Sequence, residues 1–239
     1  MKLEGAAVLV SGGNRGLGRA LVEALVRRGA GTVYVGVRDR RTLAEKGRVA
    51  LALDVTDEAS VRGAAAQCSD VNLLINNAGI CRFSPHTGPD AAEDAREEME
   101  VNYFGLQRMC RAFAPVLAAN GGGAVVNVLS TLSLHALPRC ATYCASKSAA
   151  WSLTNSLRME MRAQGSLVCS VYAGLIDTDM VREAPGAKMS PSAAAAAILD
   201  GIERSDEEIF VDDHSRRVKA GLADDLKRIY PAVEARSRA

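Results

Sequence analysis

An apolar run that stops at a glycine-rich turn constrains the fold of this chain more than any other feature. Residues 6–10 read Ala-Ala-Val-Leu-Val, residues 11–18 read Ser-Gly-Gly-Asn-Arg-Gly-Leu-Gly, and Leu21, Leu25 and Val26 then recur at helical spacing. Such a strand-to-helix turn lets backbone N–H groups approach a phosphate closely, with the partial positive charge of a helix N-terminus behind them. The glycine spacing differs from the G-x-G-x-x-G of the common dinucleotide fingerprint. By itself the turn therefore leaves a nucleotide site and a plain tight turn both open.

Strand-like and helix-like segments alternate along the rest of the chain. We expect further strands over residues 32–37, 49–53, 71–75, 124–129, 167–172 and 208–211. The patterns between these strands predict a helix capped near Thr56 and further helices from about Asp90 to Ala119, over 143–165 and over 193–203. A charged helical tail is expected after the last strand. Residues 39–48 are too few for a full helix, so that crossover is expected to be abbreviated. The alternation predicts a single α/β domain over residues 1–239, with a doubly wound parallel sheet of about seven strands flanked by helices.

The composition excludes several classes of partner. A formal net charge of +1 gives no electrostatic reason to expect nucleic acid or an anionic membrane surface as a partner. No apolar stretch approaches the roughly 18 residues of a membrane span, and the first strand begins so early that we expect no signal peptide. The six cysteines lack C-x-x-C spacing and the three histidines lack metal-ligand spacing. We therefore expect reduced thiols, no bound metal and a cytoplasmic location.

The residues after the second predicted strand indicate which dinucleotide would bind. In dinucleotide-binding folds an acid at this strand end accepts the ribose 2′-OH, whereas a nearby Arg accommodates a 2′-phosphate. Here Val37 takes the place of the acid and Arg38 follows it, while Arg15 of the glycine turn could reach the same phosphate. The alternative is that Arg38, Arg40 and Arg41 are a solvated turn, whose positive charge Asp39 weakens. We favour NADP(H) over NAD(H).

Four polar features lie farther along the chain. Asn76-Asn77-Ala78-Gly79 follows the fourth strand, and Asn102 lies inside a long helical pattern. Ser130 ends the fifth strand, and Tyr143 and Lys147 lie four residues apart on one helix face. Each alone is compatible with a structural role: a surface pair, a strand-end cap or a surface Asn.

Together with the glycine turn, these features resemble the short-chain dehydrogenase/reductase family of the classical type, in its order and spacing from residue 6 to about 180. The resemblance implies a Rossmann-type fold and a set of catalytic residues. Tyr143 would exchange a proton with the substrate oxygen, and Lys147 would lower the phenol pKa from its ordinary value near 10 and bind the nicotinamide ribose. Ser130 would bind the substrate oxygen, and Asn102 would hold a water that links Lys147 to solvent.

The resemblance also implies the cofactor contacts. Phosphate and ribose contacts would come from Gly12, Asn14, Arg15, Gly16, Leu17, Gly18 and Arg38; adenine contacts from Asp54 and Val55; ribose contacts from Asn77, Ala78, Gly79, Tyr143 and Lys147; and carboxamide contacts from Ile176 and Thr178. One departure is Ala173-Gly174, where the family usually has Pro-Gly. Without the fixed φ of proline, the turn after the sixth strand is expected to be less pre-organised.

The substrate and assembly predictions are coarser. Residues 179–190 would form a short lid with Met180, Val181 and Met189 as its apolar members, and no Arg or Lys is obviously placed for an anionic substrate. Cys140 and Cys144 either react with thiol reagents or simply pack. The expected pocket residues are Cys81, Leu132, His135, Leu137 and Cys140. The resemblance also implies a homodimer or homotetramer formed through helices 91–119 and 143–164. Small residues on these helices (Ala112, Ala114, Ala145, Ala149, Ala150) would allow close packing between subunits.

The sequence thus predicts an NADP-dependent oxidoreductase, of the carbonyl reductase or ketoreductase type, that reduces a small ketone or aldehyde or oxidises the matching alcohol. Two alternatives remain. One is an isomerase or dehydratase on the same scaffold, which would form product without net cofactor turnover. The other is a non-catalytic protein that senses NADP, which would need none of the four catalytic residues.

Overall fold

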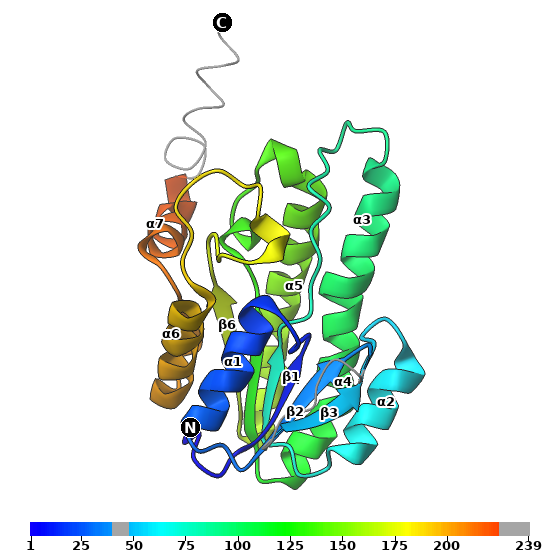
Figure 1. Cartoon of the computed structure of the whole chain (residues 1–239), viewed down its shortest axis with the longest axis vertical. Helices are drawn as coiled ribbons and strands as arrows, with labels where there is room; N and C mark the ends of the chain where they lie inside the picture. Colours follow the sequence, from blue (N-terminus) through cyan, green and yellow to red (C-terminus); the bar gives the residue numbers. More distant parts are fainter. Residues whose placement is uncertain (40–47, 225–239) are drawn as a thin grey trace, which may run out of the picture.

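The computed structural model describes residues 1–39 and 48–224, and its centre is one parallel sheet. In this part of the chain seven strands pair in the order β3-β2-β1-β4-β5-β6-β7, so the winding direction reverses between β1 and β4 (Figure 1). This doubly wound arrangement confirms the predicted fold class. The strands are β1 (Ala7–Ser11), β2 (Thr32–Val37), β3 (Arg48–Ala52), β4 (Leu73–Asn76), β5 (Gly123–Val128), β6 (Ser166–Tyr172) and β7 (Glu208–Phe210).

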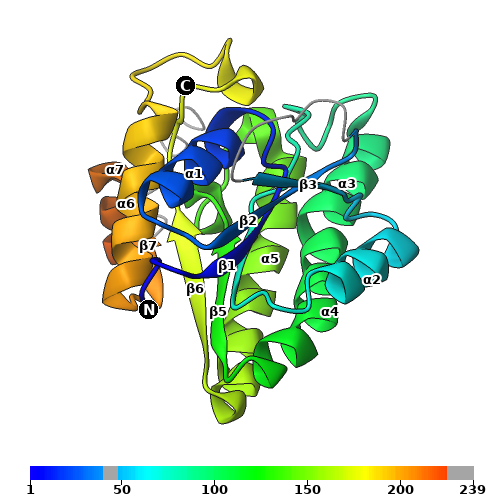
Figure 2. The same cartoon turned by 60° about the horizontal axis from the view of Figure 1, so that its bottom comes forward.

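Helices cover both faces of the sheet (Figure 2). One face carries α1 (Gly16–Arg27) and α6 (Pro191–Arg204), with α7 (Asp213–Gly221) beside them. The other carries α2 (Glu58–Gln67), α4 (Leu106–Ala119) and α5 (Ala141–Glu160), and α3 (Ala91–Met99) continues the line of α4. No helix in the described ranges is long and apolar enough to cross a membrane.

The strands are apolar on both sides because both faces are covered. In β1, Val8 and Val10 point into the core beneath α1 and α6, whereas Leu9 points into the core beneath α4 and α5. All three are fully buried. Burial of each such side chain contributes about 1.5–3 kcal/mol, so the first strand is anchored in both cores. This anchorage holds the turn that follows it in place.

The predicted elements differ from the structure mainly at their ends. The second strand has the predicted bounds, and the other strands shift by one or two residues. The cap of α2 is Asp57, whose carboxylate accepts the Ala59 N–H at 2.9 Å, and not Thr56, whose hydroxyl instead donates to Asp54 at 2.7 Å. The predicted short crossover, with Arg40 and Arg41, and the end of the tail beyond residue 224 lie outside the described residues.

The helix predicted over residues 90–119 is interrupted. A π-helical segment, Glu100–Gly105, separates α3 from α4. In this segment Gly105 packs closely against the loop before α2, and a Cβ at this residue would lie 2.8 Å from Val55 Cγ2. Short π segments are rare and occur mostly at functional sites, and this one contains Asn102.

Candidate active site

The glycine turn after β1 forms one end of the site. Gly12 has φ +65°, a left-handed conformation that favours glycine. Gly18 lies in the first turn of α1, where a Cβ would overlap the Gly12 carbonyl and lie 2.5 Å from Asn77 Nδ2. The backbone therefore forms a cradle that side chains would fill, at the N-terminus of a helix. This geometry fits a phosphate of a dinucleotide.

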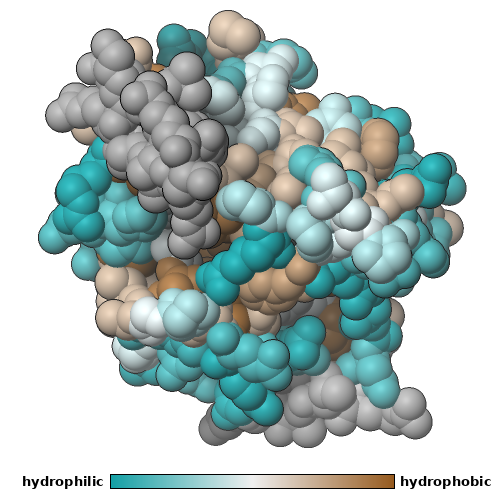
Figure 3. Space-filling model, turned by 90° about the horizontal axis from the view of Figure 1, so that it is seen from above, coloured by the Kyte–Doolittle hydropathy of each residue, from teal (hydrophilic) through white to brown (hydrophobic). Residues whose placement is uncertain are grey.

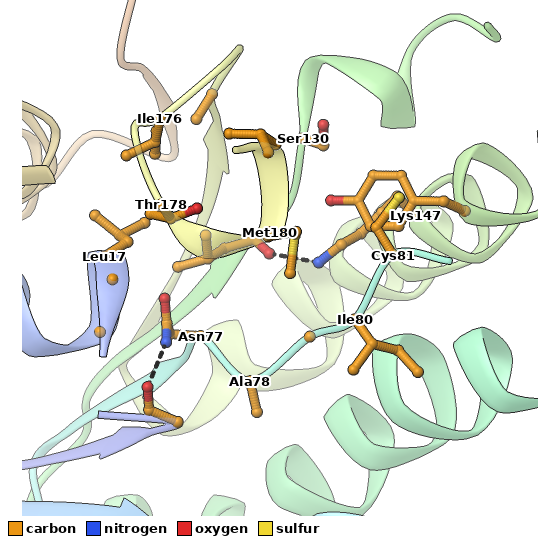
Figure 4. A pocket seen from close by; sticks show the side chains of 18 of the residues that line it. Leu17, Asn77, Ala78, Ile80, Cys81, Ser130, Lys147, Ile176, Thr178 and Met180 are labelled. Carbon is orange, nitrogen blue, oxygen red and sulfur yellow. Dashed lines mark hydrogen bonds between the residues drawn. The ribbon is translucent and has the colours of Figure 1, made fainter. Parts of the chain in front are cut away.

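The motif after β4 holds this turn in position. Asn77 Nδ2 donates to the carbonyl oxygens of Ser11 at 3.0 Å and Gly12 at 3.2 Å. In return, Ser11 Oγ accepts the N–H groups of Asn77 at 3.0 Å and Ala78 at 3.1 Å. Ser11 is a functional residue that sequence reasoning missed. Figure 4 shows Asn77 pointing toward the turn, so its amide group clamps two strand ends together.

A single cavity of about 1170 Å³ runs from the glycine turn to the end of β5. Figure 3 shows the face that it opens on, where hydrophobic residues appear between more hydrophilic ones. Every predicted cofactor residue lines this cavity: Gly12, Asn14, Arg15, Gly16, Leu17, Gly18, Arg38, Asp54, Val55, Asn77, Ala78, Gly79, Tyr143, Lys147, Ile176 and Thr178. Residues from six parts of the chain thus meet at the carboxyl edge of the sheet, where the strand order reverses.

Two arginines lie on the wall of the cavity beyond the glycine turn. Arg15 and Arg38 are both exposed there, whereas Val37 is buried in β2. Next to them, burial by itself would raise the pKa of Asp54, but hydrogen bonds from Thr56 and the charge of Arg38 together lower it. Arg38 therefore lines the cavity and also stabilises the charge of the Asp54 carboxylate.

Ser130 and Tyr143 meet at the inner end of the cavity. Ser130 follows β5 and caps the short 3₁₀ helix Thr131–Ser133, its Oγ accepting the Leu132 N–H at 3.1 Å. Tyr143 lies in the first turn of α5, where the Ser130 side chain is near enough to lower the Tyr143 pKa. Both line the cavity, so two hydroxyl groups are available to one ligand oxygen.

Lys147 lies one helical turn beyond Tyr143 and is almost completely buried, at 5% exposure. Its Nζ donates to the Val128 carbonyl at 3.0 Å and lies 5.8 Å from the centre of the Tyr143 ring. Figure 4 shows Lys147 beside Cys81, on the opposite side of the cavity from Leu17 and Thr178.

The expected lowering of the phenol pKa is not found. Burial is the largest influence on the Tyr143 pKa and raises it above the ordinary value, and the neighbouring Cys81 adds to the increase, whereas the Ser130 side chain opposes it. Burial also lowers the pKa of Lys147 to about 8. The Lys147 charge is thus itself disfavoured, and Tyr143 is protonated at neutral pH.

Asn102 lies behind the cavity wall and does not line it. At 1% exposure, its side chain accepts the Ile80 N–H and donates to the Ile80 carbonyl, both at 2.9 Å. It also donates to Ser146 Oγ at 3.0 Å. A Cβ on Gly79 would lie 3.1 Å from Asn102 Oδ1 and 3.5 Å from Lys147 Nζ. The Asn102 amide therefore fixes the wall beside Lys147, with Ser146 as a partner that sequence reasoning missed.

The comparisons with known proteins agree with this geometry. The short chain dehydrogenase family profile matches residues 6–188, which is most of the chain. The chain belongs to the short-chain dehydrogenase family. Its members are oxidoreductases that use nicotinamide cofactors and act on small molecules, and the Rossmann-like sheet described above is their fold.

The individual relatives are named for different activities. A sorbitol dehydrogenase of Cereibacter sphaeroides is 34% identical over 191 residues, which cover 74% of this chain and 73% of the relative. The 3-oxoacyl-(acyl-carrier-protein) reductase FabG of Vibrio harveyi is 31% identical over 194 residues, 76% of this chain and 78% of the relative. Among solved structures, a short chain dehydrogenase from Burkholderia cenocepacia J2315 in complex with NADP is 42% identical, with a TM-score of 0.92 and coverage of 99% and 98%.

The substrate end of this short-chain dehydrogenase is less apolar than its sequence predicts. The five expected residues line the cavity: Cys81, Leu132, His135, Leu137 and Cys140. Arg139 and Lys188 also line it, which corrects the expectation that no cation is placed there. Lys188 Nζ is bound to the Arg182 carbonyl at 2.8 Å, whereas Arg139 is exposed at the mouth. Sequence reasoning could not place these cations because they reach the cavity from separate segments.

The segment after β6 folds back on itself at the mouth of the cavity. Asp177 N donates to the Met189 carbonyl at 2.8 Å, and Met189 N donates to the Leu175 carbonyl at 2.9 Å. Between these bonds, Met180 and Val181 lie in a 3₁₀ turn and line the cavity, and Figure 4 shows Met180 between Thr178 and Lys147 in this view. The predicted lid residues thus lie in a loop whose two ends are joined by backbone hydrogen bonds.

A carboxylate from α7 holds the turn in which this short-chain dehydrogenase has Ala173-Gly174. Asp212 Oδ2 accepts the Gly174 N–H at 2.7 Å, and its Oδ1 accepts the Ser215 N–H at 2.7 Å as the N-cap of α7. The Ala173 carbonyl accepts the Thr131 N–H at 2.9 Å. Asp212 lies 38 residues beyond Gly174 in the chain, so no local sequence pattern could reveal this clamp.

We expect Asp212→Ala to lower the melting temperature by about 2–4 °C. Loss of an N-cap costs roughly 1 kcal/mol, which corresponds to about this shift in a chain of this size. Differential scanning fluorimetry would measure it. Asp213→Ala is the matched control, because Asp213 is exposed and pairs only with the neighbouring Arg216. Equal shifts for the two variants would contradict the clamp.

Proposed function

We propose that this chain is an NADP(H)-dependent oxidoreductase of the carbonyl reductase type, which reduces a ketone or aldehyde or oxidises the matching alcohol. The observation that carries this proposal is the convergence of Ser130, Tyr143 and Lys147 in the cavity that starts at the glycine turn. The two hydroxyls and the buried cation lie at one end of the cavity, and the phosphate cradle lies at the other. This arrangement suits hydride transfer between a dinucleotide and a small carbonyl compound.

The cofactor preference rests on Arg15 and Arg38. A 2′-phosphate carries nearly two negative charges, and the planar guanidinium donors of Arg match its oxygens. The 42% identical structure in complex with NADP supports the same choice. When bound, the nicotinamide supplies or accepts the hydride. The residues that line the cavity from Gly12 to Thr178 would hold the cofactor, with the glycine turn at the phosphates and Ile176 and Thr178 at the carboxamide.

The proton steps follow from the side chains that meet at the inner end of the cavity. In reduction the Tyr143 hydroxyl gives its proton to the substrate oxygen, and Ser130 Oγ donates a hydrogen bond to the same oxygen as negative charge develops there. Because burial keeps Tyr143 protonated at neutral pH, the site is ready to donate. The Lys147 cation then stabilises the phenolate that remains, and a water near Asn102 would return the proton.

We expect the rate of reduction to fall as pH rises through about 8. The Lys147 pKa is lowered to about 8 by burial, so its charge is present below that pH and lost above it. The raised Tyr143 pKa means that oxidation, which needs the phenolate as base, increases with pH over the same range. Profiles of kcat/KM in both directions would test this. Parallel profiles for reduction and oxidation would contradict the assignment.

The substrate proposal is a small or medium ketone or aldehyde with an apolar body. Leu132, Leu137 and Met180 line the cavity near the two hydroxyls. Burial also lowers the pKa of His135, so this imidazole is neutral at pH 7. We further propose that residues 179–190 act as the lid over this end.

A panel of ketones, aldehydes and secondary alcohols, followed by NADPH absorbance, tests the function directly. The proposal requires net oxidation of NADPH or reduction of NADP⁺ with at least one class. Product formation without net change in NADPH would instead indicate an isomerase or dehydratase. Binding of NADPH with no turnover on any class would indicate a sensor.

We also propose a homodimer or homotetramer, and a cytoplasmic location. The subunit contact that we propose leaves out Ala112, Ala114 and Ala150, which pack against the chain's own core, and includes Ala145, which is exposed on α5. The exposed Phe104 and Met159 add apolar surface on the same helical layer. Light scattering during size exclusion would measure the mass. The proposed location rests on the sequence, whose six cysteines lack C-x-x-C spacing.

A further inference from the structure

Two cysteines flank Tyr143 at the start of α5. Cys140 is the N-cap residue and Cys144 lies one turn farther along. Both are buried, at 2% and 3% exposure, and each thiol shifts the pKa of the other. Cys140 also lines the cavity, so a small molecule that enters the site reaches this thiol directly, and Cys144 lies one helical turn from it.

The surroundings of the pair favour a thiolate. Cys144 lies in the first turn of α5, where the helix N-terminus carries partial positive charge. The Leu137 N–H donates to Cys144 Sγ at 3.4 Å. The neighbouring Cys140 thiol is the largest influence on the Cys144 pKa, which is lowered to about 7, and Cys144 in turn raises the pKa of Cys140. One proton is thus readily lost from the pair near neutral pH.

The other cysteines lack these features. Cys68, Cys110 and Cys169 lie in the two cores, and burial raises the pKa of each to about 12. Cys81 lines the cavity, but burial raises its pKa to about 11. Because the thiolate is the reactive form of cysteine, the pair at α5 is set apart by its environment as well as by its position.

We propose that Cys140 and Cys144 form an oxidative modification site, at which a hydroperoxide entering through the cavity converts the two thiols to a disulfide and inactivates the enzyme. One thiolate attacks the peroxide oxygen, the O–O bond breaks, and a sulfenic acid and hydroxide form. The second thiol then attacks that sulfur and water leaves. In sum, two thiols lose two electrons and two protons, and hydrogen peroxide becomes two molecules of water.

Helix geometry permits this disulfide, but its formation would displace residues of the active site. Residues four apart on a helix are separated by about 6 Å along its axis, within the roughly 4.4–6.8 Å that separates the Cα atoms of a disulfide. The two sulfurs must nevertheless approach each other to about 2.0 Å. Tyr143 lies between them in the chain and shares the movement. A displacement of about 1 Å at a reacting group can reduce the rate on the order of a hundredfold.

Peptide mass measurement tests the modification without any substrate. Trypsin cleaves after Arg139 and Lys147, which releases residues 140–147 with both cysteines and no other. The full-length protein is treated with hydrogen peroxide, and remaining thiols are alkylated before digestion. We expect this peptide to be unalkylated and lighter than its reduced form by two hydrogen atoms. A peptide alkylated at both cysteines, or oxidation confined to Cys81, would overturn the proposal.

The functional consequence is tested on the same samples. We expect peroxide to reduce NADPH-dependent ketone reduction at least tenfold, and dithiothreitol to restore it. Cys140→Ser and Cys144→Ser, each compared with its own untreated activity, should lose this reversible response, whereas Cys68→Ala should keep it. A disulfide in the peptide without loss of activity would overturn the inactivation. If the proposed carbonyl reduction itself were wrong, no untreated sample would show turnover, yet the peptide mass would still report the disulfide.

Discussion

Replacing Tyr143 with Phe is expected to lower kcat at least a thousandfold and to leave the Kd for NADPH within about twofold. A positioned acid or base contributes on the order of 10²–10⁴ to the rate, and the Tyr143 hydroxyl is the proton donor that we propose. The ring is retained in Phe, so the cavity wall keeps its shape. Steady-state turnover and NADPH fluorescence titration measure the two quantities.

Tyr103→Phe is the matched control for this experiment. Tyr103 lies in the π-helical segment, and its ring contacts Phe104 instead of lining the cavity. Its loss of a hydroxyl should leave kcat within about twofold of the parent. Retained turnover in the Tyr143 variant would remove that residue from catalysis. A large loss of NADPH affinity would instead assign it a binding role.

Replacing Arg38 with Ala is expected to raise KM for NADPH at least tenfold and to change KM for NADH little. The tenfold effect corresponds to about 1.4 kcal/mol, which is at the lower end of what a hydrogen bond to a charged group contributes. Arg38 lies exposed on the cavity wall after β2, where a 2′-phosphate and not a 2′-OH would require a cation. Initial rates with both cofactors measure the difference.

Arg27→Ala provides a charge-matched control, because Arg27 is exposed in the last turn of α1, away from the glycine turn. It should leave both KM values unchanged, since general loss of positive charge is not the proposed cause. Equal increases for NADPH and NADH in the Arg38 variant would show that this residue does not recognise the 2′-phosphate. The same pair of cofactors then tests Arg15, the second arginine on the wall.

Local patterns were sufficient for the fold and for most of the candidate site. Apolar runs that alternate with helical periodicity predict a parallel sheet, because strands buried on both faces must be apolar throughout. The glycine turn, Ser130 and the Tyr143–Lys147 pair all lie at strand ends or one helical turn apart. Parallel strands bring their carboxyl ends to one edge of the sheet, so the order of these motifs along the chain predicts that they meet.

Some features depend on contacts between distant segments, and only the tertiary structure decided them. Asp212 accepts a hydrogen bond from Gly174, 38 residues earlier in the chain. Asn102 hydrogen-bonds Ile80 and Ser146 from a π-helical segment that the local sequence pattern does not predict. The pKa of Tyr143 depends on burial, whose effect exceeds the one expected from Lys147. The sequence by itself determined which elements form and which chemical groups stand at their ends, because periodicity and turn chemistry are local. Packing decided how deeply those groups are buried and which partners they meet, because desolvation and long-range hydrogen bonds depend on every element around them.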